Sequence, residues 1–422
     1  MTVFYGGAQF RMARDSKNQI VGLDIGTSKI LAVVCEVLPG SELKLIGLGD
    51  AKSEGIKRGI VVDIDATVVS IQNALHEAEL MADCKISHVY VGLTGKHLRG
   101  ETSSGMVVVR HNDEVTEADV QRAVETSTAI SIAGDRRVLL IEPQEFRLNE
   151  EPVRVPVGMI GKRLEVLTYI VSGAKGAAEN LAKCVRRSGL KEEDAVPLLN
   201  PVASSSAVLT DDERELGVAC LDIGAGTTDI AVYRGGTIRY IVALPIAGEL
   251  ITADIAHALQ ISTADAENIK IEHGCARELH VDAQVQIEVP AVGGRNPRML
   301  SKQALAAVIQ PRVEEIFRLV RDAIPENDLT LLTSGFVLTG GTAEMPEIVE
   351  LAEDIFQRPV RRGVPHYSRT LADMVSKPRA ATVMGLLEIG RRERADDKRV
   401  ALEKGRMKTS LEWLRDFFVG NF

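Results

Sequence analysis

Two short segments of the sequence combine an aspartate, glycines and hydroxyl residues in a way that suits phosphate binding. Residues 20–37 read IVGLDIGTSKILAVVCEV, and residues 217–233 read GVACLDIGAGTTDIAVY. In each segment an apolar run ends in an aspartate, Asp24 or Asp222, and a glycine-containing turn leads into a second apolar run. Glycines let the backbone approach a phosphate closely, so that successive N–H groups can point at its oxygens. The alternative is two ordinary glycine-rich β-hairpins, and the presence of both segments in one chain argues against it.

Each turn therefore supplies a set of candidate phosphate ligands. They are Asp24, Gly26, Thr27 and Ser28 in the first segment, and Asp222, Gly224, Gly226, Thr227 and Thr228 in the second. The hydroxyl groups can add hydrogen-bond donors to those of the backbone. Because Mg²⁺ keeps several waters and takes few carboxylates, we expect it to be held through waters between Asp24 and Asp222.

A third glycine-containing turn fits the same site. Residues 336–344 read FVLTGGTAE, which predicts a strand ending at Gly340 and Gly341 and leading into a helix near Pro346. Small residues at a strand-to-helix turn let a flat base and its ribose lie against the backbone. A single glycine pair is weak evidence, but together with two phosphate turns it predicts a nucleotide site.

The elements that position these turns follow from the hydrophobic pattern. The two aspartates lie 222 − 24 = 198 residues apart, which predicts two similar domains that face each other, each opening with a β-hairpin. Further strands are expected at 88–93, 106–109, 138–141, 167–171 and 335–339, and helices at 66–82, 116–130, 174–187 and 381–389. Val69, Ala74 and Leu80 are expected on the apolar face of the first helix. Thr116 is expected to cap the second helix, with Asp119 three residues on.

Composition limits the class of protein. The chain has 422 residues, 45% hydrophobic and 26% charged, which suits a globular protein of two or three domains. Fifty basic against 59 acidic residues give a net charge of −9, which argues against nucleic-acid binding. The five cysteines lie far apart, which favours a reducing compartment and neither disulfides nor a zinc site. No apolar run approaches the ~18 residues that span a bilayer, and no secretory signal is evident. We expect a cytoplasmic protein with a disordered leader at 1–16, within which Met12 is an alternative start.

The C-terminal residues 406–422, RMKTSLEWLRDFFVGNF, predict an amphipathic helix. Its apolar side would consist of Met407, Leu411, Trp413, Leu414, Phe417, Phe418 and Phe422. From residue 391 to the end there are nine basic and six acidic residues, a local charge of +3, and the charged run 391–405 is expected to be a solvated linker. A locally basic, aromatic-rich helix on a charged tether indicates an interfacial membrane anchor. The alternative is a terminal helix that docks on the globular core.

Two DIG hairpins followed by an LTGG turn resemble the actin-like ATPase superfamily. The similarity is closer to the FtsA family of bacterial cell-division proteins, in segments 74–97, 208–233, 264–276 and 289–298. This resemblance implies an α/β, actin-like fold of two lobes, built from duplicated RNase H-like domains, with ATP and Mg²⁺ between them. It also implies a family-specific inserted subdomain and the C-terminal amphipathic helix.

In the terms of that family, the resemblance divides the chain into subdomains. They are 1A at 17–93 and 168–209, the inserted 1C at 94–167, 2A at 210–247 and 303–390, and 2B at 248–302. Glu267 and Lys270 would reach the ribose and base, although an E-x-x-K pair on a helix is usually a surface ion pair. Asn200 stands where many superfamily ATPases carry a Glu or Gln to orient the attacking water, so we expect at most slow hydrolysis.

The resemblance also implies a function. The protein would tether FtsZ filaments to anionic lipids of the inner membrane at the division site, self-assemble into actin-like protofilaments and recruit later division proteins. The FtsZ C-terminal tail would bind on 2B, where Arg295, Arg298 and Lys302 form a basic cluster that is otherwise a solvated face. The alternatives are an actin-like scaffold of pilus assembly, as PilM is, and an actin-fold kinase or ATPase.

Overall fold

The structure, a computed structural model, is built around two five-stranded sheets of matching topology. It describes residues 4–5, 18–40, 42–110, 113–130, 132–191, 194–290, 296–367 and 372–403. The first sheet has the order β12-β7-β2-β3-β4 and the second the order β15-β14-β13-β18-β19. In each, three antiparallel strands are extended by two parallel ones, so the predicted duplication of an α/β domain is confirmed.

The bounds of the sheet strands agree with the apolar runs of the sequence. Lobe 1 contains β2 (Gln19–Ile25), β3 (Lys29–Val37), β4 (Leu43–Lys52), β7 (Val89–Leu93) and β12 (Ala195–Leu199). Lobe 2 contains β13 (Val218–Ile223), β14 (Thr228–Arg234), β15 (Thr237–Leu244), β18 (Phe336–Thr339) and β19 (Val360–Arg362). The strands β2 and β13 are almost entirely buried, and each pairs with the next strand as the predicted hairpin.

Helices cover both sheets. In lobe 1 they are α1 (Ile64–Ala82), α3 (Lys175–Arg187) and α4 (Asn200–Val208), with the short hairpin β5 (Ile56–Lys57) and β6 (Ile60–Val61) before α1. In lobe 2 they are α5 (Asp211–Leu216), α8 (Lys302–Ala323), α9 (Glu326–Leu329), the 3-10 helix η3 (Gly341–Glu344), α10 (Ile348–Phe356), α11 (Ala372–Val375) and the 3-10 helix η4 (Pro378–Ala380). The last described helix, α12 (Ala381–Glu403), returns to lobe 1 and contacts β2, β3 and β7.

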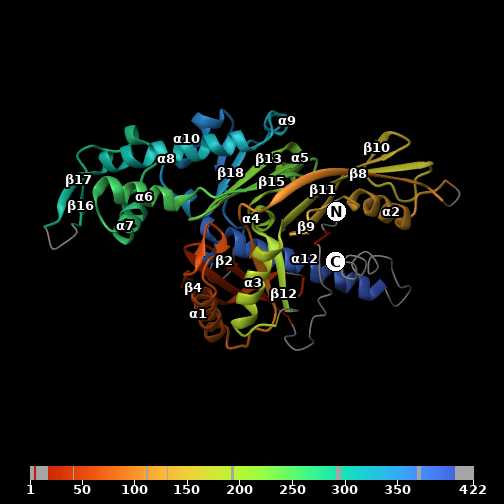
Figure 1. Ribbon diagram of the computed structural model, residues 1–422, viewed down its shortest axis with the longest axis horizontal. Coiled ribbons are helices and arrows are strands. Elements are labelled where there is room, and N and C mark those ends of the chain that lie inside the picture. The colour runs from red at the N-terminus through yellow and green to blue at the C-terminus, as the bar shows by residue number, and fades with distance from the viewer. Residues whose placement is uncertain are drawn as a thin grey trace.

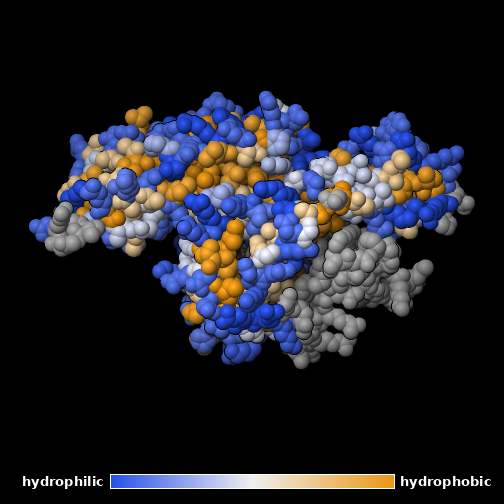
Figure 2. Space-filling view, in the orientation of Figure 1, coloured by the Kyte–Doolittle hydropathy of each residue, from blue (hydrophilic) through white to orange (hydrophobic). Residues whose placement is uncertain are grey.

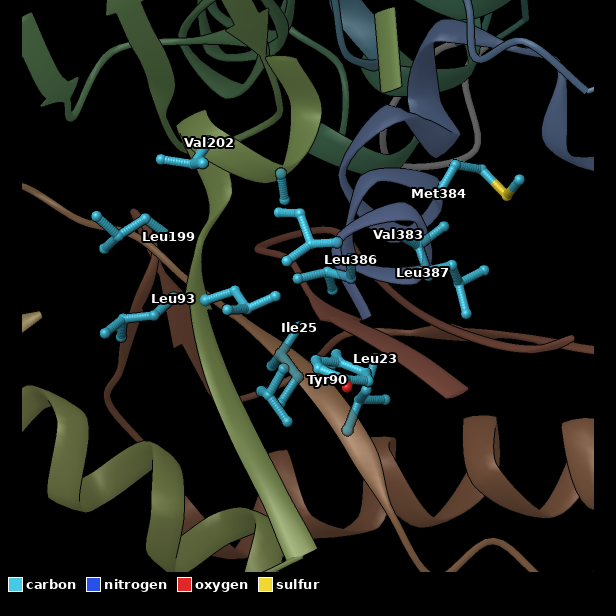
Figure 3. Packing of buried hydrophobic residues seen from close by; sticks show 14 of the residues in the cluster. Leu23, Ile25, Tyr90, Leu93, Leu199, Val202, Val383, Met384, Leu386 and Leu387 are labelled. Carbon is cyan, nitrogen blue, oxygen red and sulfur yellow. The ribbon is translucent and has the colours of Figure 1, made fainter. Parts of the chain in front are cut away.

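The two lobes are joined at the crossing of α4 and α12. A Cβ added at Gly385 would lie 1.7 Å from the carbonyl oxygen of Ala203, so the two helix backbones are in direct contact. Around this crossing, apolar side chains of α12 such as Val383 and Leu386 pack with those of α4 and of β2, as Figure 3 shows. Since α4 also contacts β13 and β14, one continuous core connects the sheets.

Two further units extend from this frame, at opposite ends of the long axis in Figure 1. The inserted unit follows β7 and contains β8 (Arg99–Val108), α2 (Glu117–Thr128), β9 (Arg136–Leu148), β10 (Glu151–Val153) and β11 (Arg163–Ala174). The other follows β15 and contains α6 (Gly248–Leu259), α7 (Thr263–His273), η2 (Glu278–His280), β16 (Gln286–Val289) and β17 (Arg298–Ser301). The capping box of Thr116 and Asp119 at the start of α2 is confirmed. A single strand, β11, crosses the boundary expected after residue 167 and pairs with β8 and β9 of the inserted sheet.

The structure corrects three predictions. On α1, Ala74 is buried but Val69 and Leu80 are 54% and 69% exposed, because the buried face follows Val68, Ile71, Leu75 and Ala78. The leader predicted at 1–16 is not wholly disordered, because β1 (Phe4–Tyr5) pairs with β9; its other residues lie outside the described ones. The run 391–405 is not a linker, since α12 continues through its charged residues to Glu403.

The cause of this last error is physical. Arg, Lys and Glu are good helix formers, and the ion pairs of Glu388 with Arg391 and Arg392 lie one turn apart on α12. An apolar period is therefore not needed to continue the helix.

The face in Figure 2 is largely hydrophilic, with apolar areas on both lobes. Exposed apolar residues such as Leu80 are ordinary on a protein surface.

Candidate functional site

The two predicted phosphate turns face each other between the lobes. Each is closed by the same hydrogen bond, from Gly26 N to Lys29 O and from Gly224 N to Thr227 O, both 3.0 Å. A Cβ added at Gly226 would lie 2.4 Å from Oγ1 of Thr27, so the turns of the two lobes are in contact. Segments that are about two hundred residues apart in the sequence are thus brought to one place.

These turns leave backbone donors unused. The N–H groups of residues 27, 28, 225 and 226 have no acceptor among the residues that the structure describes. A buried or half-buried turn with free N–H groups is the arrangement that binds phosphate oxygens. The backbone of both turns therefore fits the phosphates of a nucleotide.

The two aspartates at the strand ends lie in a desolvated environment. The pKa of Asp24 is raised to about 6. Burial is the largest cause, the charge of Lys29 opposes the increase, and the nearby Asp222 adds to it. Burial also raises the pKa of Asp222, which accepts a hydrogen bond of 2.8 Å from Thr382 Oγ1. Two buried carboxylates that repel each other are stabilised by a cation.

The carboxylates fit the hydrated Mg²⁺ expected from the sequence. Within the described part of the chain, no three His, Cys, Asp or Glu side chains gather closely enough to ligate a metal by themselves. A site with two carboxylates suits an ion that keeps most of its waters. Asp24 and Asp222 are the side chains that would hold it.

The glycine pair after β18 lies against the second phosphate turn. Gly340 has φ +85°, which favours glycine, and a Cβ there would lie 2.4 Å from Oδ1 of Asp222. Thr342 Oγ1 donates to Gly224 O at 2.8 Å, which ties this turn to the phosphate turn. Gly341 is exposed, so the pair forms an open wall beside the aspartate.

Glu267 and Lys270 on α7 are connected to the same turn. Lys270 Nζ donates to Glu267 Oε2 at 2.7 Å, to Thr252 Oγ1 at 2.8 Å and to Gly248 O at 3.2 Å. Gly248 N in turn donates to Gly224 O at 3.1 Å. The lysine side chain is 9% exposed, so this is not the solvated surface pair that its spacing usually indicates.

The hydroxyl residues of the turns differ from one another. Thr228 is fully buried, and its hydroxyl donates to Ile246 O at 2.7 Å. It is the first residue of β14, and its role as a phosphate ligand stays a prediction. Thr27 Oγ1 accepts from Gly59 N at 3.2 Å, and Ser28 is exposed.

Two residues that the sequence did not single out connect the lobes beneath the turns. Thr94 Oγ1, just after β7, donates to Asp229 Oδ1 at 2.5 Å. Burial, Asp222 and Asp24 together raise the pKa of Asp229 well above its ordinary value. Asp229 is visible in the second motif, but nothing in the sequence indicates its partner, 135 residues away.

Asn200 lies at the same end of the parallel strands as Asp24, because it is the first residue of α4, directly after β12. It is 7% exposed, and its Oδ1 has no hydrogen-bond partner in the described structure. A Cβ added at Gly92 would lie 2.4 Å from that oxygen, so the amide packs against β7.

The remaining predicted residues lie apart from the site or outside the described residues. Arg298 Nη2 donates to Leu259 O at 2.6 Å, at the far end of lobe 2. Arg295 and all seven predicted membrane residues, Met407, Leu411, Trp413, Leu414, Phe417, Phe418 and Phe422, lie outside the described residues. No helix in the described ranges is both long and apolar enough to cross a membrane.

Comparison with known proteins places the chain among division proteins. The family described as "Cell division protein FtsA" matches residues 219–385, and the family described as "SHS2 domain inserted in FTSA" matches residues 95–172, which include most of β11. The Cell division protein FtsA of Pseudomonas aeruginosa is 44% identical over 415 residues, which cover 96% of this chain and 99% of that protein. The Escherichia coli K12 protein of the same name is 40% identical over 414 residues, covering 94% and 98%.

Solved structures share the actin-like fold at low sequence identity. A chain of the PilM-PilN type IV pilus biogenesis complex has a TM-score of 0.61 and 18% identity, covering 88% of this chain and 98% of its own. MreB5 of Spiroplasma citri bound to AMPPNP has a TM-score of 0.56 and 14% identity, covering 91% and 99%. At such identities these likenesses show the fold alone.

Proposed function

The chain belongs to the FtsA family of cell division proteins, and from this premise we propose that it is an ATP-binding, actin-like membrane tether of the division ring. One observation carries the nucleotide part of the proposal. Two phosphate turns and a glycine wall converge on two buried carboxylates where the lobes meet.

The residues of the site have distinct roles in this proposal. The free N–H groups of residues 27, 28, 225 and 226 bind phosphate oxygens, and Thr27 and Thr227 line the same space. Asp24 and Asp222 hold Mg²⁺ through waters, which neutralises phosphate charge when the ion is bound. Gly340 and Gly341 face the adenosine, and Lys270 with Glu267 lies on the ribose side. Asn200 carries no base, so the nucleotide acts mainly as a conformational ligand with at most slow hydrolysis.

The membrane part of the proposal rests on the sequence of residues 406–422. Their apolar and aromatic side binds anionic inner-membrane lipids from the cytoplasm, and the basic residues add electrostatic attraction. A single interfacial helix binds weakly and reversibly, so assembly of copies into protofilaments strengthens attachment. Support for assembly comes from the inserted unit, which exposes Met106, Val108 and Ile160 at 52%, 68% and 80%.

The partner part of the proposal follows from family membership. The protein holds FtsZ filaments at the inner membrane by binding the FtsZ C-terminal tail on the unit of α6 and α7, and it recruits later division proteins. Arg298 and Lys302 at the far edge of that unit supply positive charge beside the strand pair β16 and β17. Pilus assembly is not favoured, because the FtsA proteins are 40–45% identical over most of the chain and the pilus complex 18%.

Co-sedimentation with anionic liposomes tests the tether and its nucleotide dependence. The full chain, a chain stopped after Gly405, and the full chain with Phe417→Glu and Phe418→Glu are compared with and without Mg-ATP. Of these three proteins we expect only the unaltered full chain to pellet, in an amount that ATP changes. Glu412→Gln, on the polar side of the same segment, is the matched control and should pellet like the parent. Equal sedimentation of all four proteins would contradict the anchor.

A further inference from the structure

A short hairpin of lobe 1 lies directly over the phosphate turns. Strands β5 and β6 pair Ile56 with Val61 and Lys57 with Ile60, which leaves Arg58 and Gly59 as a two-residue loop. Gly59 N donates to Thr27 Oγ1 at 3.2 Å, and a Cβ on Gly59 would lie 3.2 Å from Thr227. The loop thus touches the first turn and the second at once.

The loop conformation is unusual for its sequence. Arg58 has φ +50° and Gly59 has φ +73°, the geometry of a type I′ turn, in which Asn, Asp or Gly is preferred at the first position. A left-handed conformation is uncommon for arginine, and contacts of the surrounding structure must hold it there. The base of the hairpin is rigid, because Gly55 O accepts from the N–H groups of Val62 and Asp63 at the start of α1.

The hairpin places two exposed cations at the mouth of the site. Lys57 and Arg58 are exposed. Burial raises the pKa of Glu249, the second residue of α6 in lobe 2, and the charges of Lys57 and Arg58 act against this increase. Glu249 N donates to Ala225 O at 2.8 Å, so this carboxylate lies beside the second phosphate turn. The two cations therefore face lobe 2 across the phosphate turns.

Other cations near the site are already bonded. Lys29 Nζ donates to Arg379 O, Arg379 pairs with Asp50, and Lys270 pairs with Glu267. Neither Lys57 nor Arg58 forms an ion pair with a carboxylate of the described residues. Lys57 and Arg58 can therefore meet an additional phosphate without breaking an ion pair.

We propose that Arg58, supported by Lys57, binds the outermost phosphate of a nucleoside triphosphate and so distinguishes it from a diphosphate. A guanidinium binds phosphate with two hydrogen bonds, and it does so here from lobe 1 while the second turn binds from lobe 2. Because the loop already touches both turns, Arg58 reaches the phosphate by moving its side chain alone. The inference deepens the proposed ATP site and rests on it.

Titration calorimetry of the full chain with Mg-ATP and with Mg-ADP tests this assignment. Arg58→Asn removes the charge and keeps a residue that adopts the left-handed conformation readily, so the turn is preserved. We expect its affinity for ATP to fall by about tenfold or more, while that for ADP changes by less than about twofold. Arg58→Lys should restore part of the loss. Lys85→Ala, an 89% exposed lysine at the far end of α1, is the control and should leave both affinities unchanged.

Three outcomes would overturn the assignment, and each leads to a different conclusion. If Arg58→Asn lowers the affinities for ATP and ADP by the same factor, the hairpin only shapes the site. If it changes neither affinity, Arg58 does not contact phosphate. If the parent protein binds neither nucleotide, the proposed ATP site itself fails, and the role of Arg58 fails with it.

Discussion

The sheets of the two lobes have the same topology, but the large insertions follow different strands. In both, the third antiparallel strand, β4 or β15, is followed by an extra segment before the helix that leads to the central parallel strand. In lobe 1 that segment is the short β5–β6 hairpin, and in lobe 2 it is the whole unit of α6, α7, β16 and β17. The large insertion of lobe 1 comes later, after β7.

This difference separates what the shared sheet does from what the insertions do. The two sheets place Asp24 and Asp222 at equivalent strand ends. The segments inserted after β4 and β15 supply the residues that surround these aspartates in each lobe. Lobe 1 therefore covers the phosphate turns with a rigid cationic loop, and lobe 2 presents Lys270 and Glu267 from a separate unit. A symmetric frame thus produces a site with two unlike halves.

The insertion of lobe 1 also contacts lobe 2. Tyr169 of β11 accepts from Ile241 N of β15 at 2.8 Å, and Gln144 Nε2 of β9 donates to Ile238 O at 2.6 Å. The α4–α12 crossing, the pair of Thr94 and Asp229 and the contact of the two turns also connect the lobes. Relative motion of the lobes must disturb at least one of them.

The largest effect is expected at the helix crossing that both lobes share. Gly385→Ala places a methyl group on the carbonyl of Ala203, so α4 and α12 must separate, and we expect a loss of about 3 kcal/mol in the free energy of unfolding. Gly176→Ala in α3 is the matched control, because a Cβ there meets nothing within 4 Å. It should stabilise the protein by up to ~1 kcal/mol. Urea unfolding measures both, and equal stabilities would show that the crossing is not tight.

A second prediction compares Asp24 with Asp222, whose carboxylate accepts a hydrogen bond from Thr382. The pKa of Asp24 is raised from 3.8 to about 6, so the folded state binds more protons than the unfolded state between these pH values. Its contribution to stability therefore falls as pH rises from about 4 to about 6, by roughly 2–3 kcal/mol. Asp24→Asn should remove this fall and stabilise the nucleotide-free protein at pH 7, at the expense of Mg-ATP binding.

Asp222→Asn is the comparison for that variant. Thr382 donates a hydrogen bond to the Asp222 carboxylate, and the neutral amide oxygen of an asparagine accepts it more weakly, so this substitution should stabilise less. The measurement is the free energy of unfolding of both variants and the parent at several pH values from 4 to 7. A difference between Asp24→Asn and the parent that stays constant over this range would contradict the assigned pKa.

The direct polar contact between the lobes should matter somewhat less. Thr94→Val leaves the buried Asp229 carboxyl without its donor and should cost about 1–2 kcal/mol. Thr94→Ser keeps the hydroxyl and should cost less than half as much. Thermal unfolding of the two variants measures the difference, and a larger loss for Thr94→Ser than for Thr94→Val would mean that packing of the threonine methyl, rather than the hydrogen bond, connects the lobes.

Much of the frame could be predicted because its signals are local. The hairpins of Asp24 and Asp222 are visible as apolar runs around glycine turns, and the cap of α2 as Thr116 followed by Asp119. Hydrophobic periodicity did not predict the helix where no apolar period exists, as in the charged half of α12. It also misplaced Val69 and Leu80, because a short apolar pattern does not identify which face of a helix is buried.

The site could be predicted only in part, because half of it depends on contacts between distant segments. The sequence identifies the turns and the glycine pair, but it does not show that Thr94 meets Asp229 or that Gly59 meets Thr27. It also does not show that the hydroxyl of Thr228 is taken by Ile246. Such pairings depend on how the lobes pack, and no local pattern encodes them.

The smallest effect separates the contact that the inserted unit makes with β15 from another contact between the lobes. Tyr169 and Tyr367 each accept a hydrogen bond from a backbone N–H, of Ile241 in lobe 2 at 2.8 Å and of Leu45 in lobe 1 at 2.7 Å. Tyr169→Phe and Tyr367→Phe should each cost about 1 kcal/mol, because each leaves one N–H without its acceptor. Only Tyr169→Phe should speed amide hydrogen exchange along β15, since it releases the insertion of lobe 1 from that strand. If both variants leave exchange in β15 unchanged, the hydrogen bond of Tyr169 does not hold β15, and the insertion is carried by lobe 1 alone.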